Sequence, residues 1–328
     1  MRATFLDFDS LGPGDTDGAP LTRLLPDCVF HGATAVSDRR DRIADAEIVF
    51  VNKVALDREV IEAATELRLI CVAATGTDNI DLDAARERGI MVCNIRDYCT
   101  PSVVQHVYAM LLTLNQHLPA YRMRVERGDW SSNDQFCLLE PPVRELAGKT
   151  LGIVGLGTLG RAVADAGRAF GLKVLAARQP YRLTDNSPLY NVSHSGVARI
   201  GFGALLARAD YLSLHCPLTR DTLKLINAEA LALMRPEAIL INTARGGLVD
   251  SDALLHVLGN GQLGGAAIDV LDSEPPPPEH PLLTARLTNL IVTPHMAWAA
   301  QESRQRAIEE LAANVAAFQQ GGARNRVS

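Results

Sequence analysis

Short apolar runs rich in β-branched residues alternate with longer helical patterns through almost the whole 328-residue chain. These runs are apolar on both faces, which is typical of parallel strands that helices cover on each side. Such an alternation, continued along a whole chain, predicts an α/β fold. The expected strands are Thr4–Leu6, Ile48–Val51, Leu69–Ala73, Ile90–Cys93, Thr150–Val154, Lys173–Ala177, Tyr211–Leu214, Ala238–Ile241, Ala266–Val270 and Leu290–Val292.

Two long helices are expected on either side of the middle of the chain. The strongly apolar segment Ser102–Leu118 follows Thr100-Pro101, a polar cap and a proline that fit helix initiation. The amphipathic segment Gln301–Phe318 ends near two glycines. Between Trp130 and Pro142 the chain is polar and turn-rich, which predicts a surface connection. Because the chain is longer than one hydrophobic core usually serves, we expect two domains.

Composition excludes several classes of protein. With 47% hydrophobic and 21% charged residues the chain has ordinary globular composition, and its net charge of -6 argues against a nucleic-acid partner. Asp7 comes too early for a signal peptide, and no apolar run is long enough to span a membrane. The six cysteines are scattered without zinc-site spacing. We therefore expect a cytoplasmic protein with reduced thiols and no metal site.

A glycine-rich turn follows the strand that ends at Val154. The sequence there reads Gly155-Leu156-Gly157-Thr158-Leu159-Gly160 and continues into a helical pattern. The first glycine permits a tight turn, the second lets the backbone approach a pyrophosphate, and the third lets helix and strand pack closely. The helix N-terminus would stabilise the phosphate charge. Between two strands, this pattern predicts a dinucleotide site; a tight turn without a ligand is the alternative.

The residue at the end of the next strand bears on which dinucleotide binds. An acidic side chain there would accept hydrogen bonds from the adenosine ribose and indicate NAD. This chain has Arg178, and no carboxylate follows until Asp185. Because an arginine can pair with a 2′-phosphate, the sequence favours NADP over NAD. The alternative is a solvated arginine in an enzyme that accepts either cofactor.

Ionisable residues follow three further expected strands. Arg245 comes after the run Ile241-Asn242-Thr243-Ala244, Glu274 lies in the segment that begins at Asp269, and His295 follows Thr293-Pro294. Ligands of open α/β sheets bind at the carboxyl ends of the strands, so these groups are candidates for one site. His215-Cys216-Pro217 ends another strand and is expected to line the cofactor crevice; a simple turn is the alternative.

With the glycine loop, these three segments resemble the family of D-isomer-specific 2-hydroxyacid dehydrogenases over essentially the whole chain. The stretches Thr75–Asp81, Phe136-Cys137-Leu138-Leu139 and Pro294–Trp298 are most similar to bacterial glycerate dehydrogenases, also called hydroxypyruvate reductases. The resemblance implies two Rossmann-like, doubly wound parallel-sheet domains. The dinucleotide-binding domain, residues 99–298, would be inserted into a discontinuous substrate-binding domain of residues 1–98 and 299–328, with the catalytic cleft between them.

The resemblance also implies a reaction and roles for the residues. The enzyme would interconvert a small 2-keto acid, hydroxypyruvate or glyoxylate, and its D-2-hydroxy acid by hydride transfer with NAD(P)H. Arg245 would orient the substrate, His295 would be the acid/base, and Glu274 would be the partner that stabilises the imidazolium. Asp269 and Asp272 compete with Glu274 for that partner role, and the family spacing favours Glu274.

The expected ligand contacts extend beyond these three residues. The substrate would contact Ala74, Thr75, Gly76, Arg245 and His295, and Asn52-Lys53 would help to hold an anion unless the lysine is simply solvated. The other histidines are expected to be packed or on the surface: His31, His106, His117, His194, His256 and His280. The expected cofactor contacts are Gly155, Gly157, Thr158, Leu159, Gly160, Arg178, His215, Cys216, Pro217, Thr243, Ala244, Arg245, Asp269 and His295.

The sequence leaves alternatives for the function, and it also bears on the size of the substrate site and on the oligomeric state. Phosphoglycerate and formate dehydrogenases are alternatives within the enzyme class, and a nucleotide-sensing corepressor of the same fold is the alternative outside it. Many family members have glycine and serine where this chain has Ala297-Trp298, so the indole is expected to narrow the substrate site or to touch the nicotinamide end of the cofactor. The apolar helix Ser102–Leu118 and the connection after it predict a two-fold homodimer.

Overall fold

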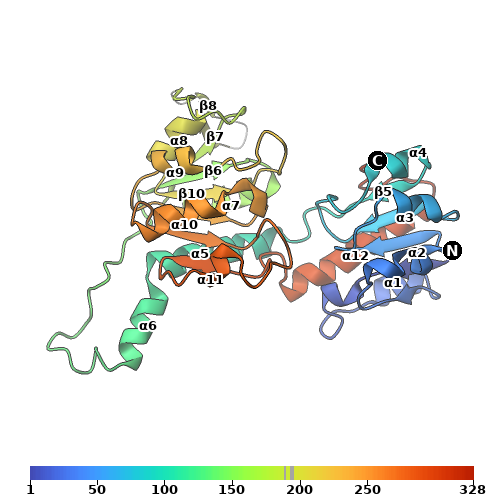
Figure 1. Cartoon of the computed structure of the whole chain (residues 1–328), viewed down its shortest axis with the longest axis horizontal. Coiled ribbons are helices and arrows are strands. Elements are labelled where there is room, and N and C mark those ends of the chain that lie inside the picture. The colour runs from blue at the N-terminus through green and yellow to red at the C-terminus, as the bar shows by residue number, and fades with distance from the viewer. Residues whose placement is uncertain (188–189, 193–195) are drawn as a thin grey trace. The chain divides into compact units, whose positions relative to one another are not determined.

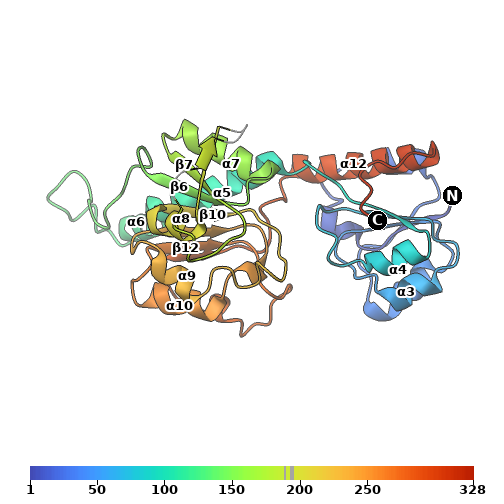
Figure 2. The same ribbon diagram turned by 90° about the horizontal axis from the view of Figure 1, so that it is seen from above.

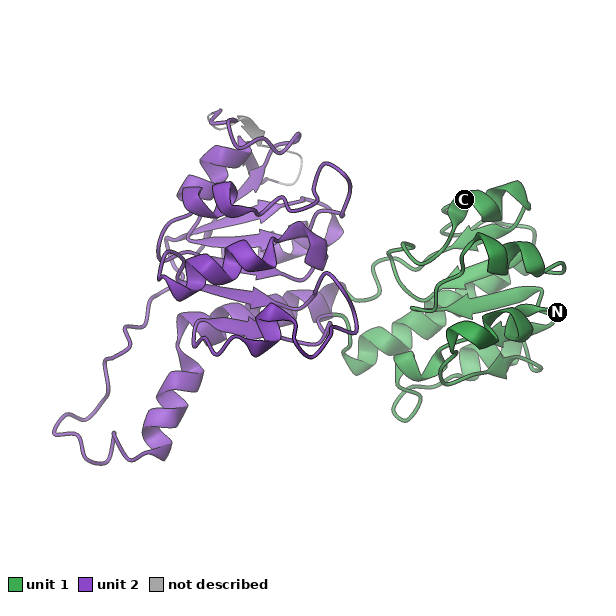
Figure 3. Ribbon diagram, in the orientation of Figure 1, with its two compact units in different colours: residues 1–99, 298–328 green, residues 100–297 purple. Residues whose placement is uncertain are grey.

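The computed structural model describes residues 1–187, 190–192 and 196–328. The chain forms two compact units, which Figure 3 distinguishes by colour. Unit 1 comprises Met1–Cys99 and Trp298–Ser328, and unit 2 comprises Thr100–Ala297. Both ends of the chain therefore belong to unit 1. Each unit has its own parallel sheet, as the alternation of strands and helices predicts.

Unit 1 is built on a five-stranded parallel sheet with the order β2-β1-β3-β4-β5. Figure 2 shows α12 (Gln301–Gln319) on one face of this sheet and α3 (Arg58–Ala63) and α4 (Leu82–Glu87) on the other. Helix α1 (Ala19–Leu24) packs against α12. Phe5 and Phe50 stack within the sheet core, with ring centroids 5.5 Å apart. The strands are β1 (Ala3–Phe5), β2 (Val29–Phe30), β3 (Ile48–Val51), β4 (Leu69–Val72) and β5 (Met91–Cys93).

Unit 2 contains an eight-stranded sheet with the order β13-β12-β11-β10-β6-β7-β9-β8. Neighbouring strands are parallel except for β8, which pairs antiparallel with β9 at the edge. The order reverses between β6 and β10, and this reversal is the place where doubly wound sheets bind ligands. The strands are β6 (Thr150–Val154), β7 (Lys173–Ala177), β8 (Tyr190–Val192), β9 (Ala198–Ile200), β10 (Tyr211–Leu214), β11 (Ile239–Asn242), β12 (Gly265–Ile268) and β13 (Leu290–Val292).

Helices cover both faces of the unit 2 sheet (Figures 1 and 2). On one face, α5 (Thr100–Asn115) packs on α7 (Thr158–Ala169), and the buried Tyr108 hydroxyl donates to the Val163 carbonyl at 2.7 Å. The helices of the other face are α8 (Phe202–Arg208), α9 (Ala228–Leu233), α10 (Ser251–Gly259) and α11 (Pro281–Thr284).

Side-chain caps fix where several of these helices begin. Asp57, Asp81, Asn227 and Asp250 each precede a helix, α3, α4, α9 and α10 respectively. Each accepts a hydrogen bond from the backbone N–H three residues further on. A free amide of the first turn is thereby satisfied, so the chain leaves the preceding loop at a defined residue.

The expected strands are confirmed in place, and several match to the residue, such as β3, β6, β7, β10 and β13. The expected helix Ser102–Leu118 is wrong at its C-terminal end. The helix begins at Thr100 and ends at Asn115, because His117 adopts a left-handed backbone with φ 51° and starts the separate helix α6 (Leu118–Glu126). The C-terminal helix is confirmed to within one residue.

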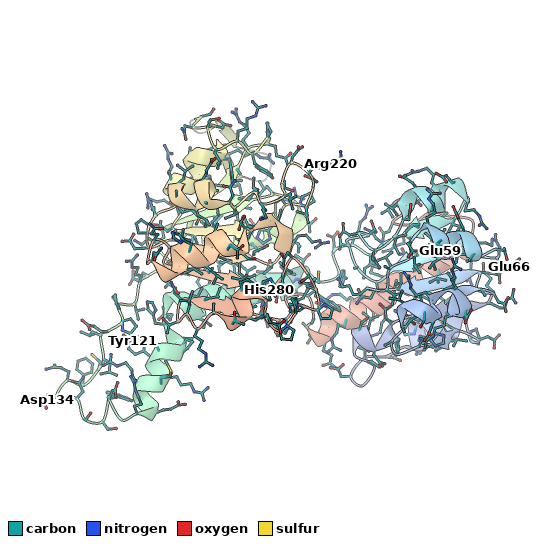
Figure 4. All side chains as sticks on the ribbon, viewed as in Figure 1. Glu59, Glu66, Tyr121, Asp134, Arg220 and His280 are labelled. Carbon is teal, nitrogen blue, oxygen red and sulfur yellow. The ribbon has the colours of Figure 1, made fainter. Side chains whose placement is uncertain are left out.

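The segment after α6 is a surface connection, as the sequence predicts. Together, α6 and the irregular chain up to residue 145, here called the arm, extend away from the sheet of unit 2 (Figures 1 and 3). Tyr121, labelled in Figure 4 with Asp134, donates from its hydroxyl to the Pro141 carbonyl at 2.7 Å. That bond ties the returning chain to α6.

The sequence also predicts reduced cysteine thiols and lacks an apolar run that is long enough to span a membrane. All six cysteines are free thiols. In the part of the chain that the structure describes, no helix combines the length and the apolar character needed to cross a bilayer.

Candidate active site

The glycine turn after β6 is fixed by close packing at two of its three glycines. Gly155 has φ +96°, and a Cβ on it would lie 2.5 Å from the Cys216 nitrogen in the turn after β10. A Cβ on Gly160 would lie 2.0 Å from the Gly155 carbonyl oxygen. A Cβ on Gly157 would meet nothing within 4 Å. Gly155 and Gly160 therefore hold the turn against the protein, whereas open space lies in front of Gly157 at the N-terminus of α7.

This arrangement fits a dinucleotide. The N-terminus of the twelve-residue helix α7 offers unpaired amides to a phosphate, and Gly157 leaves room for it. A second observation lies in the turn after β11. There the buried Thr243 hydroxyl has no hydrogen-bond partner among the described residues. A buried hydroxyl without a partner costs free energy, so a ligand atom at this position would be stabilised by it.

The backbone of His215 and Cys216 packs directly against Gly155. The His215 Nε2 lies 2.9 Å from the Ser213 hydroxyl, and burial lowers the pKa of His215 to about 4. Burial raises the pKa of Cys216 to about 11. Both side chains are therefore neutral at physiological pH. This side of the turn offers hydrogen bonds and apolar surface rather than charge.

Arg178 follows the end of β7, and its guanidinium is hydrogen-bonded to the loop that comes after it. Its Nη2 donates to the Asp185 carboxylate at 2.8 Å and to the Ser187 hydroxyl at 3.0 Å. Hydrogen bonds from Ser187, and next from Arg178, lower the pKa of Asp185 to about 2. Asp185 is the first carboxylate after Arg178 in the sequence, but no local pattern predicts that the two side chains pair.

His295 and Glu274 are in direct contact. The His295 Nδ1 lies 2.6 Å from Glu274 Oε2, and the other carboxylate oxygen accepts the Leu271 amide at 2.9 Å. Both side chains remain partly exposed, at 27% and 33%. An ionised carboxylate only accepts hydrogen bonds, so the proton between them belongs to Nδ1. The Nε2 atom of His295 is therefore the ring nitrogen left to exchange a proton with a ligand.

Asp269 holds the loop that carries His295. This buried carboxylate accepts the Thr293 hydroxyl at 2.5 Å and the amides of Met296 and Ala297 at 2.9 Å each. Its own carbonyl accepts the His295 amide at 2.8 Å. His295 itself has a left-handed backbone with φ 51°, a conformation that a non-glycine residue adopts only when its surroundings enforce it. The Asp269 contacts supply that constraint.

His106, which the sequence predicts to be a packed or surface residue, is packed against this cluster. From α5, its Nε2 lies 3.1 Å from the Thr293 hydroxyl and 3.4 Å from the Asp269 carboxylate. Burial raises the pKa of Asp269, but hydrogen bonds from His106, Thr293 and the two amides together hold it below the usual range. The local sequence around His106 is an ordinary apolar helix, and its partners lie more than 160 residues away.

The loops of Arg245 and Glu274 touch each other. A Cβ on Gly246 would lie 1.9 Å from the Leu271 carbonyl carbon, so the chain after Arg245 packs directly on the segment that leads to Glu274. Asn242 shapes the turn before Arg245: its side chain accepts the Ala244 amide at 3.0 Å and donates to the Arg245 carbonyl at 2.8 Å. The Arg245 guanidinium donates to the Ala244 carbonyl at 2.7 Å.

The two other carboxylates considered as partners of His295 are engaged elsewhere. Asp269 is bound to Thr293 and the loop amides, and Asp272 accepts from His280 Nε2 at 2.9 Å. His280, labelled in Figure 4, is buried and accepts the Leu282 amide through its other ring nitrogen at 3.2 Å. His194 lies outside the described residues. Among those that are described, no group of three or more His, Cys, Asp or Glu side chains is arranged to hold a metal ion.

In unit 1 the loop Ala74-Thr75-Gly76 follows β4. The Asn94 side chain donates to the Thr75 carbonyl at 2.7 Å, and the Thr75 hydroxyl donates to Ile95 at 3.0 Å. The loop after β3 is held by the buried Asp7, whose carboxylate accepts the amides of Asn52, Lys53 and Val54. Both loops leave the same edge of the unit 1 sheet and are anchored by hydrogen bonds to their backbones.

Comparison with known proteins decides the family. Residues 108–297 match the model of the D-isomer specific 2-hydroxyacid dehydrogenase, NAD binding domain. A glycerate dehydrogenase of Methylorubrum extorquens is 42% identical over 287 residues, 88% of this chain and 87% of the relative. A hydroxypyruvate reductase of Blautia hydrogenotrophica is 36% identical over the full length of both. This chain belongs to the D-isomer-specific 2-hydroxyacid dehydrogenases.

A solved structure extends the similarity to the whole fold. The acyclic imino acid reductase Bsp5, in complex with NADPH and D-Arg, is 27% identical and superimposes with a TM-score of 0.85, covering all of both chains. As a member of the family, the chain is an oxidoreductase of small hydroxy and keto acids that uses a nicotinamide dinucleotide. The glycine turn of unit 2 lies inside the matched NAD-binding domain.

The two kinds of glycine in the turn are expected to respond differently to alanine. Gly160→Ala should destabilise the protein by about 1–3 kcal/mol, because its methyl group would overlap the Gly155 carbonyl. Gly157→Ala should leave the free energy of unfolding nearly unchanged but weaken NADH binding by roughly tenfold or more, since the methyl group enters the space of the pyrophosphate. Urea unfolding and NADH fluorescence titration measure the two effects. Equal losses of stability in the two variants would contradict the different roles assigned to Gly160 and Gly157.

Asp269→Asn should destabilise the protein by about 1–3 kcal/mol at pH 7, since an amide NH₂ would face backbone donors. The folded-state pKa of Asp269 lies below its usual value of 3.8, so its contribution is fully present above that value. It is lost as the pH falls through the lower folded-state pKa. The stability gap between wild type and variant, measured by urea unfolding, should therefore narrow in acid. The exposed Glu279→Gln serves as control; a gap that stays constant down to acid unfolding would contradict the argument.

Proposed function

We propose that this enzyme interconverts hydroxypyruvate or glyoxylate and the corresponding D-glycerate or glycolate. The observation that carries the proposal is the 2.6 Å contact between His295 and Glu274, together with the packing of the Arg245 loop on the segment that leads to Glu274. The names of the two relatives at 42% and 36% identity support the choice of substrate. The bulky Trp298, which packs edge-on against Tyr98 with centroids 6.3 Å apart, favours a small acid.

In the proposed reaction the dinucleotide supplies the hydride, and the protein manages one proton. His295 would donate a proton from Nε2 to the ketone oxygen, because Nδ1 is engaged by Glu274. An imidazole suits this step since it exchanges protons near neutral pH. Glu274 would stabilise the imidazolium before the transfer and keep the ring oriented after it. In the oxidative direction the same Nε2 would accept the hydroxyl proton.

Arg245 would bind the substrate carboxylate and polarise the keto group with its planar fork of N–H donors. Ala74, Thr75 and Gly76 are the other proposed contacts of the substrate, through their backbone amides. In this assignment residues 1–98 and 299–328 form the substrate-binding domain and residues 99–298 the dinucleotide-binding domain.

The dinucleotide would be held by the glycine turn and by the strand ends around it. The proposed contacts are Gly155, Gly157, Thr158, Leu159, Gly160, Arg178, His215, Cys216, Pro217, Thr243, Ala244, Arg245, Asp269 and His295. We propose NADP as the preferred form, with Arg178 pairing with the 2′-phosphate. The NADPH complex of the imino acid reductase supports this choice, and the NAD-binding description of the family supports NAD.

The central test is the rate of hydroxypyruvate reduction with NADPH and NADH in parallel. Wild type should turn over rapidly, and His295→Gln should lose at least about 10²-fold in kcat because the proton donor is gone. His256→Gln, an exposed histidine on α10, is the matched control and should keep full activity. Turnover that survives in His295→Gln would overturn the assigned role.

Rates with the two cofactors also separate the alternatives. Faster turnover with NADPH supports the role of Arg178, and turnover with NADH alone removes it. Lack of turnover with hydroxypyruvate and glyoxylate, but activity with another 2-keto acid, would point to phosphoglycerate or formate chemistry. Nucleotide binding without any turnover would support the corepressor-like alternative.

We also propose a cytoplasmic homodimer that forms through the arm. Six free thiols fit a reducing compartment. The arm exposes large apolar side chains, with Phe136 at 89%, Leu139 at 78% and Trp130 at 52% exposure. Monomeric proteins rarely leave so many apolar groups together in water, and a second copy related by two-fold symmetry would cover the same surface on both chains.

Phe136→Asp combined with Leu139→Asp should therefore convert a dimer into a monomer without loss of helix content. Analytical ultracentrifugation measures the mass, and circular dichroism checks the fold. Val36→Asp, an exposed valine of unit 1, is the control and should leave the mass unchanged. A wild-type protein that sediments as a monomer at micromolar concentration would refute the dimer.

A further inference from the structure

Backbone packing of its loop fixes the position of Asp185 next to Arg178. The loop from Leu183 to Asp185 rests directly on the start of α8. A Cβ on Gly201 would lie 2.0 Å from the Asp185 carbonyl oxygen, and a Cβ on Gly203 would lie 2.0 Å from the Leu183 carbonyl oxygen. Two glycines thus let the loop pack closely against α8. The place of the Asp185 carboxylate follows from backbone packing and does not depend on Arg178 alone.

The carboxylate, the guanidinium and Ser187 form a small hydrogen-bonded cluster. Asp185 Oδ2 accepts from Arg178 Nη2 at 2.8 Å, and Oδ1 accepts from the Ser187 amide at 3.1 Å and hydroxyl at 2.5 Å. The Asp185 side chain is 14% exposed, whereas Arg178 is 38% exposed. The backbone amide of Arg178 donates to Ile200 at 2.8 Å, which continues the pairing of β7 with β9. Arg178 is thus the more open member of a fixed pair.

This pair changes what the end of β7 offers to the adenosine ribose. A 2′-phosphate that pairs with Arg178 would approach a carboxylate one hydrogen bond away from the same guanidinium. Like charges at that distance repel, and a phosphate monoester carries more than one negative charge at neutral pH. A 2′-hydroxyl, in contrast, is able to donate to a carboxylate oxygen. Arginine and aspartate therefore favour opposite forms of the cofactor.

We propose that Asp185 is a specificity-determining residue that opposes the 2′-phosphate of NADP and accepts the 2′-hydroxyl of NAD. The proposal rests on the proposed function, in which Arg178 meets the adenosine ribose. It adds that the acidic group missing from the end of β7 is supplied by the loop that follows. The ratio of the two affinities is then set by the Arg178–Asp185 pair and not by Arg178 alone.

The test measures binding of the adenosine half alone, so that it does not depend on turnover. Isothermal titration with 2′,5′-ADP and with 5′-ADP gives the affinity ratio for wild type and for Asp185→Asn. The variant should shift the ratio towards 2′,5′-ADP by about tenfold. Fluorescence titration with NADPH and NADH should show the same shift. Asp185→Ser is a second variant without the charge and should act in the same direction.

Two controls isolate the cause. Asp165→Asn removes the same charge from a surface pair with Arg168 on α7 and should leave the ratio unchanged. Ser187→Ala keeps the Asp185 charge and should change the ratio by less than about threefold, since the repulsion remains. Thermal unfolding of each variant verifies the fold.

The outcomes distinguish this inference from the proposed function. An unchanged ratio in both Asp185 variants, or a shift towards 5′-ADP, would overturn the role of Asp185; the latter would show that the carboxylate orients Arg178 for the phosphate. If Arg178→Gln leaves the wild-type ratio intact, the assignment of Arg178 fails instead. Absence of binding by either nucleotide would remove the dinucleotide site itself.

Discussion

The buried carboxylate of Asp269 is the interaction on which the arrangement of the site depends. It lies just beyond β12 and binds the turn that follows β13 through a hydroxyl and two amides. A buried charge is tolerable only when hydrogen bonds replace the lost water, and here both oxygens are supplied. The same contacts force His295 into a left-handed backbone. The position of the His295 imidazole is thus decided by a buried carboxylate at the end of the neighbouring strand.

The parallel sheet explains why a few contacts are enough to hold the loops of the site in place. Strands β6, β7, β10, β11, β12 and β13 all end at one edge, so each loop that leaves this edge lies near its neighbours. Close backbone approaches then connect loops in pairs: Gly155 with the turn at Cys216, and Gly246 with the segment at Leu271. Because these approaches admit no side chain, they fix distances more rigidly than side-chain packing would. The flexible Glu274 and Arg245 side chains are therefore attached to loops whose backbones are already held in place.

Local signals explain which parts of the fold could be predicted from the sequence. Central strands are continuous apolar runs, and the glycine turn has a definite spacing, so both were found. The edge strand β2 and the strand β9, which lies next to the edge strand β8, are only two and three residues long and lack that signal. The break after α5 was missed because nothing in the apolar pattern indicates the left-handed His117. The pairing of Arg178 with Asp185 and the role of His106 depend on tertiary contacts, which local periodicity does not report.

His106 and Ser102 show how α5 supports the loop that carries His295. Ser102 donates to the Ala297 carbonyl at 2.7 Å, and His106, one turn further along the helix, reaches Thr293 and Asp269. The helix begins at the first residue of unit 2, and Ala297 is the last residue of that unit. Both places where the chain enters and leaves unit 2 are therefore fixed to the loop that carries His295. A displacement of either crossing would strain the hydrogen bonds around Asp269, so the same network that positions the His295 imidazole also resists its displacement.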